Sequence, residues 1–313
     1  MTFARRRFFA GSAAALGLGA LSACTSDESR AQPSVDQPSD QRSDGGSSNG
    51  DTSSWGPPTE ITEVLGASTL LALGDGTSLR LGATPDTVEL VQHGAVLWQA
   101  GGTGTEPGRF HRVTSAATGP DGSIWIVDAG NRRVQVLTAS GEPARVLGAP
   151  SGDSVPLRRP TAIAVGSDGR AYVADAGRAG VVPFGADGTP GELIGGFGAE
   201  HSFAGISALQ LTEHELIVVE ALVPRVQVWD HVGVWRRAID LPEHFAVADI
   251  AAEGEQLFLV SIDGRLARTS IDGSTAAAEV EHLGHIGGHA RGLHLGTEGL
   301  AVTAVPVPSY LIA

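Results

Sequence analysis

One turn recurs along the chain at a nearly constant interval. Acidic-glycine pairs, or a degenerate form of them, stand at Asp75-Gly76, Asp121-Gly122, Asp168-Gly169, Glu213-His214, Glu253-Gly254 and Glu298-Gly299. Successive acidic positions are 40 to 47 residues apart, and each pair lies between two short apolar segments. A repeat of this length that contains hairpins is typical of a β-propeller, in which each repeat forms one blade. We therefore expect an all-β, six-bladed propeller.

The residues around each turn predict the strands of the blades. We expect the inner strands at 68–73, 114–118, 161–165, 206–211, 247–252 and 291–295, with second and third strands following them. Hairpin glycines lie 19 residues after the second turn position, at Gly141, Gly188, Gly233 and Gly273. A tight turn with positive φ favours glycine at such positions.

The two ends of the repeat region predict how the ring closes. The last repeat ends with its third strand, at 309–313, and has no fourth, whereas the segment 60–65 reads as a strand without a sheet of its own. We expect 60–65 to form the outermost strand of the sixth blade, which would make 58–313 one closed domain.

The first residues have the pattern of a bacterial export signal. Arg5, Arg6 and Arg7 precede an apolar stretch that ends in Leu-Ser-Ala-Cys, with the only cysteine of the chain at Cys24. This ending resembles the lipobox of bacterial lipoproteins, which implies a signal peptide at 1–23 and a lipid on Cys24. Arg5, Arg6 and Phe8 also resemble the twin-arginine export motif, with general secretion as the alternative route.

Residues 24–57 are rich in Ser, Asp, Gly, Gln and Pro and have no apolar period. Such a segment buries too little surface to fold, so we expect a disordered tether between the membrane and the propeller. The expected location is the cell envelope, on the periplasmic side or the cell surface. A twin-arginine leader also suggests an accessory subunit of a co-exported redox enzyme.

Composition excludes several kinds of chemistry. The chain has 21 Arg and no Lys, so Schiff-base catalysis and a phosphate-loop lysine are excluded. A net charge of −14 argues against nucleic acid as a partner, because phosphate binding needs a positive field. The single cysteine excludes internal disulfides and four-thiolate zinc sites.

The second repeat resembles the NHL-repeat propellers. Gly-Arg-Phe-His-Arg at 108–112 and Pro-Asp-Gly-Ser-Ile-Trp-Ile-Val-Asp at 120–128, followed by Asn131 and Arg133, are close to the family pattern. The third repeat keeps Asp168-Gly169 and Asp175, and the later repeats differ more. The resemblance implies a six-bladed fold and says little about activity.

Acidic and arginine residues recur at the same phase of the repeats. We expect the loops at one end of the ring to bring these residues together as a candidate ligand-binding face. Its members are Asp128, Arg133, Arg159, Asp175, Glu220, Arg225, Arg265 and Arg291. Such a face would suit an anion or a peptide. The alternative is that the acid-arginine pairs hold neighbouring blades together, as they commonly do in NHL repeats.

Histidines also recur in the loops that lead into the inner strands. His201, His244, His285 and His289 are candidate ligands for a divalent metal, zinc or calcium, if their rings converge. Loop histidines exposed to solvent are the alternative. No His-Glu-x-x-His motif or phosphate loop is present, and no Gly-x-Ser-x-Gly elbow occurs within the expected propeller, 58–313.

These observations favour binding over catalysis. The sequence predicts a lipid-anchored propeller outside the cytoplasm that acts as a binding scaffold for a protein, peptide or small ligand. The alternative is a metal-dependent lyase or hydrolase with its site on the channel face.

Overall fold

The structure is a computed structural model, and it describes residues 61–63, 69–74, 77–82, 86–149, 156–272, 281–286, 289–296 and 299–305. The predicted signal peptide (1–23), Cys24 and the predicted tether (24–57) lie outside the described residues. None of the described residues forms a helix long and apolar enough to cross a membrane.

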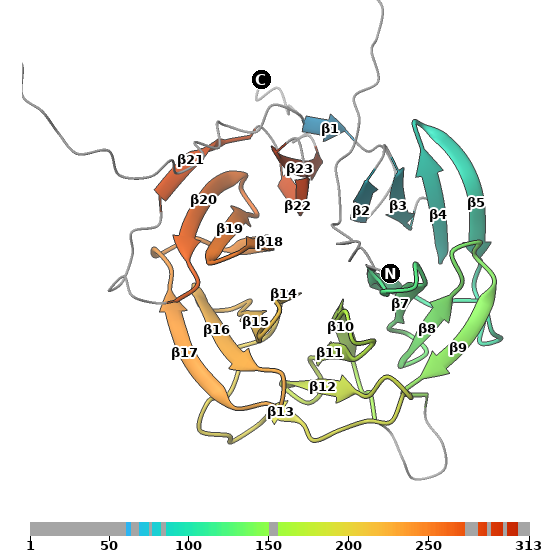
Figure 1. The fold of residues 1–313 in the computed structure, drawn as a ribbon, viewed down its shortest axis with the longest axis horizontal. Helices are drawn as coiled ribbons and strands as arrows, with labels where there is room; N and C mark the ends of the chain where they lie inside the picture. Colours follow the sequence, from blue (N-terminus) through green and yellow to red (C-terminus); the bar gives the residue numbers. More distant parts are fainter. Residues whose placement is uncertain are drawn as a thin grey trace, which may run out of the picture.

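The described strands form sheets that are arranged as a ring (Figure 1). Five sheets have four antiparallel strands each. Blade one consists of β2 (Thr69–Gly74), β3 (Thr77–Leu81), β4 (Thr87–Gln92) and β5 (Ala95–Gly101). Blade two consists of β6 (Val113–Thr118), β7 (Ile124–Asp128), β8 (Arg133–Leu137) and β9 (Pro143–Leu147). Blade three consists of β10 (Pro160–Val165), β11 (Ala171–Asp175), β12 (Gly180–Phe184) and β13 (Ile194–Gly195).

Blade four consists of β14 (Ala208–Leu211), β15 (Glu215–Val219), β16 (Arg225–Asp230) and β17 (Trp235–Asp240). Blade five consists of β18 (Val247–Glu253), β19 (Gln256–Ser261), β20 (Arg265–Ser270) and β21 (Glu281–His285). The remaining sheet has three strands, in the order β1 (Ile61–Glu63), β23 (Gly299–Val305) and β22 (His289–Gly296). Its strand β22 contacts the inner strands β18 and β2 on either side of it.

The prediction of six four-stranded blades is therefore wrong in one respect. Five blades are complete, and the last sheet has three described strands. Strand β1 pairs in parallel with β23, with Ile61 opposite Val302 and Glu63 opposite Ala304. It thus lies directly beside the second strand of this sheet and not outside a third strand. The predicted third strand, 309–313, lies outside the described residues, so the predicted closure is not shown.

The core lies between neighbouring sheets. Apolar residues of blades two and three form one buried cluster, and blades three and four, and four and five, form similar ones. All five residues of β7 and all five of β11 are buried. Because a blade in a ring has a neighbour on each face, its second strand needs apolar side chains on both faces.

Side chains of one blade bind the hairpin of the next at a repeated position. The acceptor is the backbone carbonyl of the residue two positions before the hairpin glycine. Trp98 Nε1 donates to the carbonyl of Ala139, and Tyr172 Oη donates to that of His231. Arg145 and Arg237 donate to the equivalent carbonyls of Ala186 and Ile271. The donor type varies while the acceptor position is constant.

The predicted hairpin glycines are confirmed at three of their four positions. Gly141, Gly188 and Gly233 have φ between 85° and 89°. A Cβ on each would come within 2.8 to 3.0 Å of the outer strand of the preceding blade, at Trp98, Leu147 or Ile194. Glycine is therefore needed both for the turn and for close approach of the blades. Gly273 lies outside the described residues.

Candidate functional site

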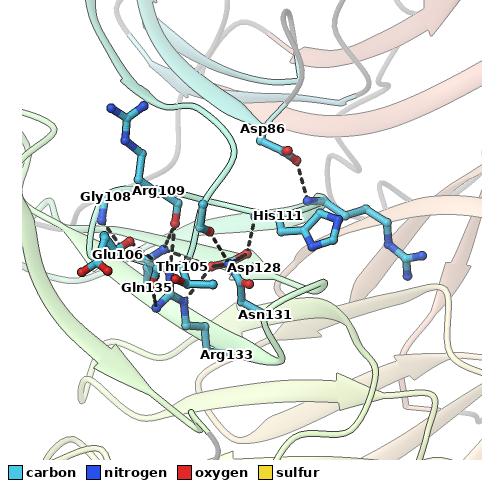
Figure 2. Close-up of polar contacts among 12 residues, drawn as sticks. Asp86, Thr105, Glu106, Gly108, Arg109, His111, Asp128, Asn131, Arg133 and Gln135 are labelled. Carbon is cyan, nitrogen blue, oxygen red and sulfur yellow. Dashed lines mark hydrogen bonds and ion pairs between the residues drawn. The ribbon is translucent and has the colours of Figure 1, made fainter.

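The end of each second strand meets the loop that comes in from the preceding blade. In blade two this meeting point is Asp128, which is fully buried at the end of β7 (Figure 2). Its carboxylate accepts hydrogen bonds from the backbone N–H of His111 at 2.7 Å and from Arg133 Nε at 2.7 Å. The side-chain amides of Asn131 and Gln135 also donate to it.

Arg133 extends this network into the incoming loop. Its Nη1 donates to the carbonyl of Thr105 at 2.6 Å, and its Nη2 donates to those of Glu106 and Arg109 (Figure 2). Arg133 is buried, so the ion pair with Asp128 is held away from solvent. The pair fixes the path of the chain between β5 and β6.

Blades three and four repeat this arrangement with different residues. Asp175, fully buried, accepts from the backbone N–H groups of Arg158 and Arg159. Glu220 accepts from the backbone N–H of Ala204 at 2.7 Å and from Arg225 Nε at 2.6 Å. The hydrogen bond with Glu220 raises the pKa of Arg225 above its usual range.

Blade five departs from the pattern. Ser261 takes the place of the buried acid, and the carboxylate moves two residues on, to Asp263. Arg265 Nε donates to Asp263 at 3.0 Å, and Arg265 Nη2 donates to the carbonyl of His244. The hydrogen bonds from Ser261 and Arg265 lower the pKa of Asp263. The side chain of Arg291 lies outside the described set.

Of the eight residues predicted to form the ligand-binding face, the structure thus places the three acids and Arg133 in buried networks. Arg225 and Arg265 are half-buried beside their acidic partners, and Arg159 is exposed. This is the arrangement expected if the pairs hold the chain together. We therefore base no ligand contact on the buried members.

Blade one contributes an acid that the sequence analysis missed. Asp86, labelled in Figure 2, accepts at its Oδ1 from the backbone N–H of Arg112 at 2.5 Å. Its Oδ2 accepts from Thr103 Oγ1. Asp86 has a φ of 59°, a conformation that aspartate tolerates better than most residues. Its place directly before the third strand was the available signal.

Arginines are exposed where the incoming loops reach blades two and three. Their backbones occupy equivalent places, because Ala129 N donates to the Arg112 carbonyl and Ala176 N donates to the Arg159 carbonyl. We call the exposed Arg112, Arg132, Arg158 and Arg159 the cationic rim. Within the described residues, none of these four side chains forms an ion pair with a carboxylate.

Of the four candidate metal-binding histidines, the three whose side chains are described lie in different surroundings. His201 stacks on Trp235 of the outer strand β17, with ring centroids 4.0 Å apart and an interplanar angle of 6°. His244 and His289 are exposed, and the side chain of His285 lies outside the described set. Across the described ranges, no three His, Cys, Asp or Glu side chains are grouped as a metal site requires. The described histidines do not fit a shared metal.

One further acid lies on the inner strand of blade five. Asp249 is half-buried and accepts from the backbone N–H of Leu293, in β22, at 3.0 Å and from that of Ile250. Burial raises its pKa to about 6. Ala162 and Ala208 stand at the equivalent position of blades three and four. An acid in a strand of small apolar residues was a signal that the sequence analysis did not use.

The ring of sheets defines the chain as an all-β propeller. Similar solved structures include a streptogramin B lyase, with 16% identity, 75% of each chain covered and a TM-score of 0.55. Virginiamycin B lyase from Staphylococcus aureus is similar too: a selenomethionine form covers 74% of each chain at 16% identity and a TM-score of 0.54. A catalytically inactive variant of that lyase with Quinupristin covers 70% of each chain at 16% identity and a TM-score of 0.52.

At this identity the likeness shows the fold alone. No protein-family model matches the chain, and no curated protein sequence matches it. The NHL resemblance therefore stays a prediction.

The role of the buried acid can be tested with Asp128→Asn. The amide would place a donor against the donors that now face the carboxylate, so we expect a loss of about 3 to 5 kcal/mol in unfolding free energy. Denaturant unfolding measures this loss, and Asp168→Asn, at an exposed turn, is the control. An Asp128→Asn variant as stable as the wild type would contradict a structural role for Asp128.

Asp249 predicts a pH dependence of stability. Its pKa in the folded chain, about 6, is above the ordinary 3.8, so the folded state favours the protonated form. Wild-type stability should therefore fall as pH rises from about 4 to about 6, by at most about 3 kcal/mol. Asp249→Asn keeps an acceptor for Leu293 and should lack this component when unfolding is measured across the range. Equal pH profiles for the two proteins would refute the assignment.

Proposed function

We propose that this chain is an exported, lipid-anchored propeller that acts as a binding platform, and that its cationic rim binds an anionic group of the ligand. The observation that carries the proposal is a difference in exposure between acids and arginines at the end of the ring where the incoming loops meet the second strands. We call this end the incoming-loop face. Asp128, Asp175 and Glu220 are buried in hydrogen-bond networks, whereas the four arginines of the cationic rim are exposed.

The rim arginines stand on fixed backbone. Arg112 is held on both sides, since its N–H donates to Asp86 and its carbonyl accepts from Ala129 N at 3.2 Å. Arg158 and Arg159 are held through their N–H groups by the buried carboxylate of Asp175. Guanidinium groups on a rigid frame lose less entropy when they bind a carboxylate. This arrangement supports recognition of an anion.

The charge of the whole chain limits the size of the anion. The net charge of −14 repels a long polyanion, so we do not propose nucleic acid as a ligand. Small ligands or peptides that carry one or a few carboxylates suit four arginines better.

The rim can be tested with the double variant Arg112→Gln and Arg158→Gln. The probe is a fluorescent acidic peptide of alternating Asp and Glu, and its affinity is measured by anisotropy at low salt. Loss of two charge-assisted contacts should weaken binding at least about tenfold. The control is Arg170→Gln, beside the Asp168 turn at the opposite end of the blade.

Equal affinity of the rim variant and the wild type would contradict the proposal. A basic peptide of the same length that bound as tightly would also contradict it, because the rim would then select nothing by charge. Near-identical thermal midpoints of the variants would show that they are folded.

The location outside the cytoplasm is part of the proposal. The lipobox-like Leu-Ser-Ala-Cys and the unpatterned 24–57 support a membrane-anchored platform on a tether. The residues at 108–112 and 120–133 that resemble the NHL pattern support an NHL-type propeller.

A Cys24→Ala variant tests the anchor. Without the thiol no lipid can be attached to sulfur, so the wild type should partition into the detergent phase and the variant into the aqueous phase. Phase partitioning of the chain produced in a bacterial host measures this. Equal partitioning would refute lipid anchoring.

A second candidate function is a lyase or hydrolase acting on the same face. Two observations favour it: the similar solved structures are lyases, one of them with Quinupristin, and Asp249 has a pKa near the range useful for proton transfer. Mass spectrometry of quinupristin incubated with the purified chain, with and without zinc or calcium, tests it. Turnover that is lost in Asp249→Asn would favour this candidate over simple binding.

A further inference from the structure

One position of the incoming loop is arginine in some blades and a small residue in others. Four places are structurally equivalent, because a backbone N–H at the end of each second strand donates to the carbonyl of each: Arg112, Arg159, Gly205 and Ala246. Blades two and three thus present arginine, whereas blades four and five present glycine and alanine. The inner strands β6, β10, β14 and β18 contact one another in this order, so the two kinds of blade form two adjacent halves of the face.

The second half also presents exposed apolar side chains. Leu222 and Ile262 follow the second strands of blades four and five, and they are 81% and 50% exposed. Phe197, in the loop from blade three to blade four, is 80% exposed, and the Gly196 beside it donates to the carbonyl of Ala179. Three large apolar residues therefore stand on the loops at this end of neighbouring blades.

Leu222 occupies a position that is glycine in the other half. In blade two, a Cβ on Gly130 would lie 2.6 Å from the His111 ring, and in blade three one on Gly177 would lie 2.7 Å from Arg158 Cβ. In blade four Ala204 takes the place of His111 and Arg158, because Leu222 N donates to the carbonyl of Ala204 as Gly130 N donates to that of His111. The smaller alanine in the incoming loop leaves room for a large side chain at the end of the strand, and this side chain is the exposed Leu222.

From these positions we infer that the face is divided and binds a short peptide with acidic residues at one end and apolar residues at the other. This inference rests on the proposed function and deepens it. The acidic end lies over the cationic rim of blades two and three, where the charges are complementary. The apolar end lies over Leu222 and Ile262, whose exposed surface is removed from water.

The probe is a fluorescent peptide with the sequence Asp-Glu-Gly-Leu-Phe-Leu, and its partner is Asp-Glu-Gly-Ser-Ser-Ser. The variant is Leu222→Ser. The control is Val232→Ser, which removes an equally exposed apolar side chain, at 77%, from the hairpin of blade four that joins β16 to β17. Anisotropy gives the affinity of each peptide for each protein.

Wild type should bind the apolar peptide about tenfold more tightly than its serine partner, because burial of one leucine side chain strengthens binding by about a factor of ten. Leu222→Ser should remove most of this difference and leave the serine peptide unchanged, and Val232→Ser should change neither.

Equal affinity of the two peptides for the wild type would overturn the inference and leave the proposed anion site standing. A Val232→Ser effect as large as that of Leu222→Ser would overturn it as well. If the wild type bound neither peptide, the proposed function would be contradicted too. Preferential binding to vesicles of anionic lipid, with no binding of the apolar peptide, would show that the face binds a membrane.

Discussion

In blades two to four the ring depends on a buried carboxylate at the end of the second strand. Asp128, Asp175 and Glu220 each accept a hydrogen bond from the backbone of the incoming loop. Two of the three also accept one from an arginine Nε at 2.6 to 2.7 Å. One group thus joins the loop from the preceding blade to two strands of its own blade. A buried charge is stable only when other groups compensate for the water it has lost, and each of these carboxylates accepts at least two hydrogen bonds. These bonds leave the loop with little freedom, so the backbone of the exposed arginines beside it is held in place.

The parts of the fold that depend on local chemistry were predictable from the sequence. The turn spacing predicted the propeller, and the hairpin positions of Gly141, Gly188 and Gly233 follow from a positive φ that glycine alone adopts without strain. The pairing of the chain ends was predicted less well. A short strand such as Ile61–Glu63 has two possible neighbours in the last sheet, and local sequence does not distinguish them. Asp86 and Asp249 were missed because their partners come from other blades.

Blade four shows how a site residue can be misjudged from repeat phase alone. His201 aligns with Gly108, because the carbonyl of the residue after each accepts a hydrogen bond from an equivalent glutamine side chain, Gln227 in blade four and Gln135 in blade two. Gly108 has a φ of 79° and its N–H donates to Gln135. His201 instead stacks on Trp235, and Gln227 Oε1 has no partner within the described residues. The histidine fills space on the outer side of the blade, and repeat phase cannot reveal a direction of this kind.

The joints between blades bear on how such a chain can diverge. Each joint uses a main-chain oxygen as its fixed half, and tryptophan, tyrosine or arginine serves as the other half. Since every residue carries that oxygen, mutation can replace one donor by another without altering the docking of neighbouring sheets. The fold can then be kept while the sequence changes, and a solved propeller with 16% identity to this chain shares the fold. When these contacts between blades are engineered, the new side chain should accordingly be a donor long enough to reach the carbonyl, and its residue type matters less.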